Sequence, residues 1–385
     1  MVTTTISPSL KIGLQMLGMW PNVPYSIIYW LMYMLSLLIV QYYQYLYVIN
    51  HFKMSEIWNL VDSLPVTLDY TLTLFKMTNF WIYRRFHQIL IAMDNDWREC
   101  INVEQHFCVM SNKANISHFY SNAILSFNVI AGTLYIVGDY AIHFIYLVDD
   151  YNSTLRQLPI RIQLPFDFEQ SPIFELLAVI LFLHVMLHMY TFTVLNGLII
   201  TLVLHVSGQI DIICQEFKNI SEKSSLYGSS AFVLGVLINK HNKVISFSNN
   251  IGKLFSFVAL MQVVWNTFVL CSLGFIIVIS INNGAGIVVI VKTICAYVAV
   301  IIEVFMICFA GEYLSFKSIS IADAAYETLW YNMPLNQSKV ITSIIMRSHR
   351  RLAITAGKMM DMSFETFSSI VRASASYISV LYAMH

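Results

Sequence analysis

Residues 173–206 read IFELLAVILFLHVMLHMYTFTVLNGLIITLVLHV, and this apolar run decides the fold class of the chain. A helix needs roughly 20 apolar residues to cross the hydrocarbon core of a bilayer, and this run is longer than that. As a single helix it would measure about 50 Å at ~1.5 Å per residue. We therefore expect a membrane-spanning helix whose inner end projects into the cytosol.

The composition of the whole chain agrees with a membrane protein. Hydrophobic residues make up 57% of the sequence and charged residues 11%, whereas soluble domains usually carry about 25% charge. The net charge is zero, so no basic field indicates a nucleic-acid partner. The sequence contains no phosphate loop, no Ser/His/Asp set and no metal-ligand spacing, and its six cysteines lack any CxxC motif. We expect no enzyme activity and no cofactor, and the partner implied throughout is the lipid bilayer.

Further apolar runs of at least ~18 residues lie on both sides of this segment. Two shorter segments, Ser9–Met19 and Val340–Thr355, are expected to be helices that lie at the membrane or in the protein interior; Pro21 and Pro24 would end the first. The sequence thus predicts an all-α integral membrane protein with seven transmembrane helices in a single domain. The seven runs are Tyr25–Ile49, Ile57–Ile82, Asn122–Val148, Ile173–Val206, Lys253–Ser280, Ile287–Tyr313 and Phe364–Met384.

The distribution of positive charge sets the orientation, because cytoplasmic loops retain Lys and Arg. With the N-terminus inside, only Lys53, Arg156 and Arg161 fall in outer loops. We therefore expect a cytoplasmic N-terminus and an extracellular C-terminus, the reverse of a G-protein-coupled receptor. The polar segment Ser207–Asn250 would join the inner ends of the helices and Val340–Thr355 in a cytoplasmic helical anchor suited to subunit contacts.

An ordered set of residues runs through the C-terminal third of the chain. The set comprises Ala325, Tyr326, Trp330, Tyr331, Pro334, Lys339, Met346, Arg347, Ala356, Gly357, Lys358, Ser363, Phe367, Ser374, Ser376, Tyr377 and Leu381. Two further segments flank the central run: LPFDFEQSPIFE at 164–175 and HVSGQIDI at 205–212. Together these features resemble the insect odorant receptor family.

The resemblance implies a fold and an activity. It implies seven helices with the N-terminus inside, which agrees with the orientation obtained from charge alone. It also implies tetrameric, odorant-gated, nonselective cation channels in the plasma membrane of olfactory neuron dendrites, in which a ligand-binding subunit assembles with a shared co-receptor. Residues 1–332 would hold the ligand-binding helices and part of the anchor, and residues 333–385 the last anchor helix and the pore helix. The loop Ser207–Gly252 has no room for the co-receptor's long insertion, so we expect an odorant-tuning subunit.

Three alternatives remain open beside this interpretation. Gustatory-type receptor channels end in a Thr-Tyr pair followed by a Gln-Phe pair, and Ser376-Tyr377 leading to Leu381-Tyr382 departs from that pattern. A G-protein-coupled chemoreceptor would need its C-terminus inside the cell. A transporter or membrane enzyme is disfavoured because the two halves of the chain show no inverted repeat.

The resemblance also assigns residues to the pore. Val380 matches the family's hydrophobic gate valine, and an apolar ring blocks ions by dewetting when it is narrow. Met384 lies four residues further on, and Ala383 stands where the co-receptor carries Gln. Arg372 lies eight residues before Val380, about 12 Å along a helix, and would either line the inner vestibule or reach sideways to Glu365 or to a lateral exit. The alternative for Val380 and Met384 is ordinary packing.

A ligand pocket is expected in the outer half of the bundle. A volatile ligand needs apolar walls with one or two polar groups, whereas the alternative for polar residues there is a hydrogen-bond network that braces the helices. The third predicted helix offers Tyr135, Asp139, Tyr140 and His143. The family places its pocket between the second, third, fourth and sixth helices, and depth in those helices adds Leu64, Leu68, Phe182, Met186 and Tyr297.

Several ionisable side chains fall inside the predicted helices. His184 and His188 stand at the i, i+4 spacing of a zinc pair, but without a third ligand we expect them to bond to neighbouring helices. Asp69, Lys76 and Glu303 carry charge within apolar runs, and Asp69 and Lys76 lie two turns apart on one face. We expect these charges to find partners across helices.

The orientation predicts the glycosylation pattern. Of the four Asn-x-Ser/Thr sequons, only the one at Asn152 is expected outside the cell. Treatment with a glycosidase should shift the electrophoretic mobility of the wild-type chain but not of the Asn152→Gln variant. A shift that persists in the variant would contradict the orientation.

Overall fold

The computed structural model describes residues 4–21, 23–52, 57–82, 85–146, 158–168, 170–222, 230–282 and 287–383. For some helical residues the structure describes the backbone and not the side chain. These residues are 57–62, 85, 134–146, 221–222, 230–231, 288 and 381. The sequon at Asn152 therefore lies outside the described residues.

The described chain is mostly α-helical, as the sequence predicted. A two-stranded antiparallel hairpin, in which Thr355 pairs with Asp361 and Ala356 with Met360, precedes the last helix. The elements are α1 (Pro8–Met16), α2 (Ser26–Asn50), α3 (Ile57–Ile82), α4 (Arg85–Ile101), α5 (Glu104–Tyr146), α6 (Ile173–Glu222), α7 (Ser230–Asn282), α8 (Ile287–Tyr326), the 3-10 turn η2 (Trp330–Asn332), α9 (Leu335–Ser348), β1 (Thr355–Ala356), β2 (Met360–Asp361) and α10 (Phe364–Ala383).

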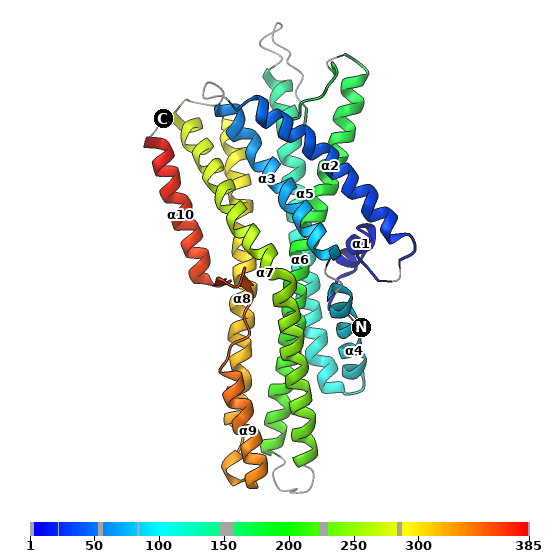
Figure 1. The fold of residues 1–385 in the computed structure, drawn as a ribbon, viewed down its shortest axis with the longest axis vertical. Coiled ribbons are helices and arrows are strands. Elements are labelled where there is room, and N and C mark those ends of the chain that lie inside the picture. The colour runs from blue at the N-terminus through cyan, green and yellow to red at the C-terminus, as the bar shows by residue number, and fades with distance from the viewer. Residues whose placement is uncertain are drawn as a thin grey trace.

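The helices form an elongated molecule with two tiers (Figure 1). In the upper tier of the view, α2, α3 and α10 lie beside the upper parts of α5, α6, α7 and α8. The last three continue downward as a narrow bundle, against which α9 packs (Figure 1). The C-terminal end of α10 and the end that carries α9 are therefore opposite ends of the molecule, as the predicted orientation requires.

The seven predicted spans correspond to α2, α3, α5, α6, α7, α8 and α10. In the described part of the chain, α2, α6, α7 and α8 are long and apolar enough to cross a bilayer on length and composition alone. The more polar α3 contains Asp69 and Lys76, and α10 contains Glu365, Arg372 and several serines. These polar helices carry the groups described in the next subsection.

Several helix boundaries differ from the sequence prediction. The third span extends inward to Glu104 because the preceding polar residues continue the same helix, and α4 was not predicted at all. The single helix expected over Val340–Thr355 is wrong: α9 ends at Ser348 and the hairpin follows. Its turn places Gly357 and Lys358 at positive φ, a conformation that breaks any helix. Likewise α1 ends before Gly18, at φ 67°, rather than at the prolines.

Ionic contacts close the inner bundle. Asp211 on α6 accepts from Lys113 at 2.9 Å and from Lys317 at 2.7 Å, which ties α5 and α8 to α6. Glu216, one turn further along α6, pairs with Lys240 of α7. The helical bundle that was expected on the cytoplasmic side is therefore present, and α9 packs against α8 and α7 at its end.

The N-terminal segment is held by buried hydrogen bonds. The Thr5 hydroxyl lies 3.1 Å from His205 Nδ1 and accepts from Trp97 Nε1 at 3.0 Å, and His205 Nε2 lies 3.1 Å from Asp96 Oδ2. Gly13 of α1 approaches Val194 of α6 so closely that an added Cβ would meet Val194 Cγ2 at 2.4 Å. The helix predicted at the membrane surface is thus packed on α6.

The base of α10 rests tightly on α8. Gly311 of α8 faces Met362, whose carbonyl oxygen would lie 2.2 Å from a Cβ at position 311. The Phe364 amide at the start of α10 donates to Glu312 Oε2 at 3.3 Å, and the Met362 amide donates to the Ile354 carbonyl at 2.8 Å. These contacts fix where the last helix begins.

We expect Gly311→Ala to lower the free energy of unfolding by about 1–3 kcal/mol, because the new Cβ would strike a backbone oxygen that cannot rotate away. Gly235→Ala in α7 is the matched control, since nothing lies within 4 Å of its added Cβ. That change should leave stability equal or slightly higher, because Ala favours helix. Thermal unfolding in detergent measures both; equal melting temperatures would contradict the tight contact.

Candidate functional site

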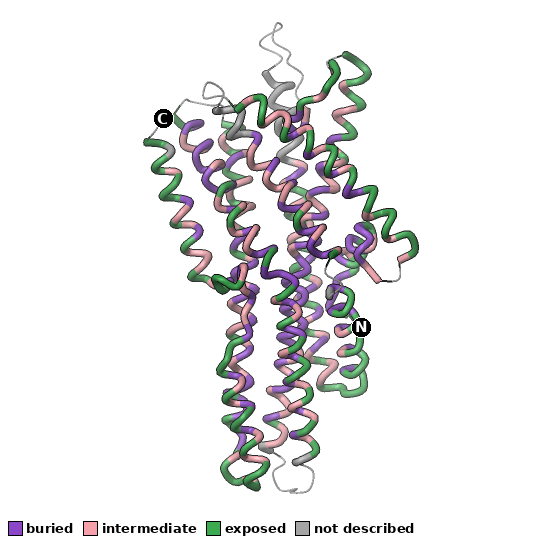
Figure 2. The backbone as a smooth tube through the Cα atoms, in the orientation of Figure 1, coloured by how far each residue is buried: buried purple, intermediate pink, exposed green. Residues whose placement is uncertain are grey.

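The exposed face of α10 carries a polar stripe. α10 packs on α7 and α8, with Ile370 and Ser374 buried against them. The opposite side is exposed along much of its length (Figure 2). Its members recur every three or four residues, the period of one helix face. They are Glu365, Ser369, Arg372, Ser376, Val380 and Ala383, and we call them the α10 stripe.

Hydroxyl groups on the stripe and beside it present oxygen lone pairs at the exposed face of α10. Ser369 donates to the Glu365 carbonyl at 2.9 Å, and Ser379 donates to the Ala375 carbonyl at 3.2 Å. Because each hydroxyl proton is used within the helix, the remaining lone pairs can accept or coordinate. Sequence reasoning missed Ser369 and Ser379, although the spacing of three to four residues among the exposed polar residues of α10 is visible in the sequence.

The structure brings three of the predicted pore residues onto one face. Arg372, Val380 and Ala383 all belong to the α10 stripe, and Val380 is 54% exposed. Arg372 lies seven residues from Glu365, about 10 Å of helix rise, so the two share a face without adjacency. The fourth residue, Met384, lies outside the described residues.

The predicted pocket residues fall into two apolar groups. Leu68 and Tyr297 pack in one cluster with Val269, Leu273 and Ile276, between α3, α7 and α8. Phe182 and Met186 pack in another with Ile160, Ile162 and Val185. Leu64 is half-buried on α3. The side chains of Tyr135, Asp139, Tyr140 and His143 lie outside the described residues.

Met186 is the member of this set that faces the third predicted span. The Thr133 hydroxyl of α5 lies 3.9 Å from Met186 Sδ, and a Cβ at Gly132 would lie 3.9 Å from Met186 Cε. On α2, Gln44 is buried, and its side-chain amide finds no hydrogen-bond partner among the described residues. Gln44 lies one turn from Val40, which packs on the Phe182 cluster, and sequence reasoning missed it.

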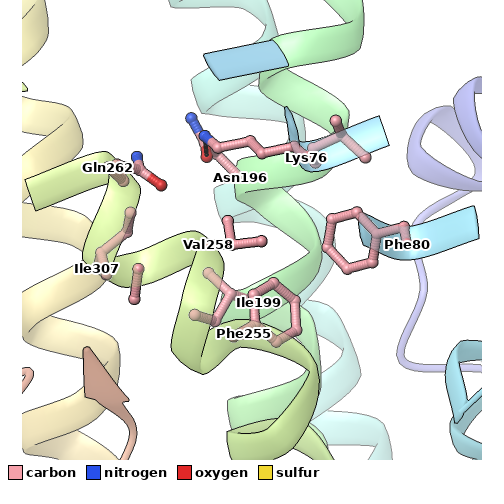
Figure 3. A pocket seen from close by; sticks show the side chains of 10 residues that line it. Lys76, Phe80, Asn196, Ile199, Phe255, Val258, Gln262 and Ile307 are labelled. Atoms are coloured by element: carbon pink, nitrogen blue, oxygen red, sulfur yellow. Dashed lines mark hydrogen bonds between the residues drawn. The ribbon is translucent and has the colours of Figure 1, made fainter. Parts of the chain in front are cut away.

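A second polar site lies in the middle of the bundle, where Lys76, Asn196 and Gln262 converge from three helices (Figure 3). The Lys76 ammonium donates to Asn196 Oδ1 at 2.6 Å and lies 3.7 Å from Glu303 Oε1 of α8. The same carboxylate oxygen accepts from Asn196 Nδ2 at 3.0 Å and from Gln262 Nε2. An adjoining cavity of about 10 Å³ has room for one water molecule.

The other intramembrane ionisable groups form a network between α3 and α6. The Tyr70 hydroxyl lies 3.2 Å from His184 Nδ1, and the Tyr70 ring stacks on His188 at a centroid distance of 3.8 Å. The Thr73 hydroxyl lies 3.0 Å from His188 Nε2, and His188 Nδ1 lies 3.8 Å from Asp69 Oδ2. The predicted partners across helices are confirmed for both histidines and for Lys76.

We expect Lys76→Met to cost about 3–5 kcal/mol of unfolding free energy, because it leaves the Glu303 carboxylate buried without its cation. The double variant Lys76→Met with Glu303→Leu should recover much of that loss. Lys243→Met is the control, since its pair with Glu99 is about half exposed and worth at most about 1 kcal/mol. Unfolding in detergent measures all three; a double variant no better than the single one would contradict the pairing.

The sequence of this chain is similar to those of known proteins. Residues 56–375 match the family model described as "7tm Odorant receptor". Odorant receptor 22c of Drosophila melanogaster is 28% identical over 237 residues, which cover 58% of this chain and 57% of that receptor. Odorant receptor 10 of Aedes albopictus is 30% identical over 146 residues, 38% of each chain. The chain thus matches about half or less of the length of these curated relatives.

Solved structures show the same fold. The insect olfactory receptor OR5 from Machilis hrabei in complex with eugenol superimposes with a TM-score of 0.80 at 13% identity, over 98% of this chain and 97% of that one. The structure of the same receptor described without eugenol gives a TM-score of 0.78 at 12% identity. At this level of identity, the similarity concerns the fold alone.

Proposed function

Because this chain belongs to the insect odorant receptor family, we propose that it is the odorant-tuning subunit of a ligand-gated, nonselective cation channel. Members of the family are receptors and channels, not enzymes. The observation that carries the proposal is the α10 stripe, which combines a carboxylate, a guanidinium and hydroxyl groups on the face of a membrane helix that points away from its own chain.

The stripe requires a wet surface beyond the single chain. Charged groups inside a bilayer are costly unless they face water or a partner. Within this chain α10 packs on α7 and α8, so a water-filled space against its far side would have to be completed by other subunits. Closed rings are the usual symmetric solution for identical or related subunits. A central pore lined by several copies of α10 satisfies this requirement.

The chemistry of the stripe fits cation passage. Oxygen acceptors at Ser369, Ser376 and Ser379 suit a hydrated cation, and Val380 would form the apolar constriction near the outer end. Arg372, one helical turn below Ser376, would reduce the local cation concentration and so limit charge selectivity. The inner bundle with α9 would hold the subunits together, and the family's pattern makes the odorant co-receptor the partner in the plasma membrane.

The ligand is proposed to be a small volatile organic molecule bound in the outer half of the bundle. The Phe182 and Tyr297 clusters offer apolar walls, and Gln44 offers a buried amide beside the first of them. A pocket for a small ligand needs mostly apolar walls with a few orienting polar groups. The similar Machilis receptor was solved with eugenol, a molecule of this kind.

Cells that express this chain together with the co-receptor should give inward cation currents when a volatile panel is applied, and cells with the co-receptor alone should give a different response profile.

Val380→Ala should raise the basal current or alter relative ion permeability, because it widens the apolar ring. Unchanged permeability would remove Val380 from the pore.

Cysteine accessibility maps the stripe itself. Ser376→Cys should make the current sensitive to a charged methanethiosulfonate reagent, because position 376 is exposed on the α10 stripe that we propose lines the pore. Ser374→Cys is the matched control, since that position is fully buried two residues away. Equal sensitivity of the two variants, each compared with wild type, would contradict the assignment of the stripe to the pore.

A further inference from the structure

We propose that Gly274 of α7, Ile378 of α10 and Tyr297 of α8 form the seat that holds the pore helix in the closed channel, and that opening requires Ile378 to leave it. The inference rests on the proposed channel function and adds to it the positioning residues of the gate. We call these three residues the α10 seat.

Gly274 makes the seat possible. A Cβ at position 274 would lie 2.1 Å from Ile378 Cδ1 and 2.9 Å from Ile378 Cγ1, so the isoleucine occupies the space of the missing side chain. The same Cβ position is 3.7 Å from Tyr297 Cε2, which places the tyrosine ring at the wall of this notch. A glycine inside a helix weakens that helix, so the close contact with Ile378 is the structural reason for its presence.

Two weaker contacts flank the seat along the same side of α10. The Cys271 thiol lies 3.9 Å from the Ser374 carbonyl, one turn inward. At the outer end, Asn282 Nδ2 donates to the Tyr382 hydroxyl at 3.0 Å, and both residues are exposed. Ser374, Ile378 and Tyr382 are spaced by four residues, so α10 meets α7 along one continuous line.

The seat governs the position of the gate because α10 is one helix. Val380 lies two residues from Ile378 on the opposite, exposed side. A helix of this length moves as a rigid body, so a pivot that lifts Ile378 from the notch also displaces Val380. The flanking contacts are a weak thiol hydrogen bond of 3.9 Å and one amide–hydroxyl hydrogen bond at an exposed end, so little holds the described contact line besides the packing of Ile378. Packed helix interfaces of this kind tend to adopt a few discrete arrangements rather than a continuous range of positions.

Tyr297 connects the seat with the ligand-binding half. Its ring packs in the cluster that includes Leu68 of α3 and Leu273 and Ile276 of α7. A ligand that moves Tyr297 changes the wall of the notch, and a ligand shifts a gating equilibrium only through such a difference in contacts between the two states. The α10 seat thus offers a contact through which ligand occupancy reaches the gate.

A size exchange tests the seat. Gly274→Ala should push Ile378 out and raise the agonist-free current severalfold at unchanged surface expression, whereas a purely structural defect would lower both. Adding Ile378→Ala should return the basal current to within about twofold of wild type, because the cavity and the new methyl group compensate. Gly235→Ala is the control and should leave the basal current unchanged. A Gly274→Ala channel with normal surface expression and normal basal current would overturn the proposal.

A reversible cross-link gives the second test. In a Cys271→Ser background, Gly274→Cys with Ile378→Cys places two thiols at the contact where a Cβ on residue 274 would meet the Ile378 side chain. Oxidation should reduce the agonist-evoked current at least tenfold and a reductant should restore it, while each single cysteine variant stays insensitive. Mass spectrometry confirms the cross-linked peptide. A cross-linked channel that still opens would overturn the seat, whereas absence of any agonist-evoked current in wild type with the co-receptor would instead overturn the proposed function.

Discussion

The absence of water from the bilayer core is the constraint on which the rest of this structure depends. Every polar group placed there needs a partner within the protein or a water-filled space. The backbone meets this demand by forming helices, and the side chains of Lys76, Asn196, Gln262 and Glu303 meet it by converging at one point. Because these residues come from α3, α6, α7 and α8, the same contacts that satisfy them also align the four central helices.

The α10 stripe is where a single chain does not meet that demand. Its charged and hydroxyl groups face away from α7 and α8, and in the proposed channel other subunits would enclose water against them. The helix is held on its other side by small residues: Gly311 at the base beside Met362 and Gly274 further out beside Ile378. A tight base with a releasable outer contact suits a helix that pivots. The polar face and the packing of α10 both support the proposed channel function.

Much of the fold was predictable from the sequence, and the failures have clear physical causes. Long apolar runs predicted all seven spans, because their length matches the bilayer and no soluble core requires it. The inner part of α5 and all of α4 were missed, since amphipathic helices outside the bilayer lack a hydropathy signal. The segment after Ser348 reads as helix by composition, yet Gly357 and Lys358 adopt the left-handed conformation of a hairpin turn.

The sequence by itself determined that this chain is a helical membrane protein. Its charge distribution predicted an orientation in the membrane, and residues spaced along the C-terminal third carried the resemblance to a family. Hydropathy and charge are local properties of the sequence, so they can be determined without a structure. Only the tertiary structure decided that Lys76 meets Glu303 across 227 positions of chain, that Leu68 joins Tyr297 while Phe182 joins a separate cluster, and that Gly274 receives Ile378. These pairings depend on how helices rotate and approach one another, which is a property of packing between distant segments that no single stretch of sequence contains.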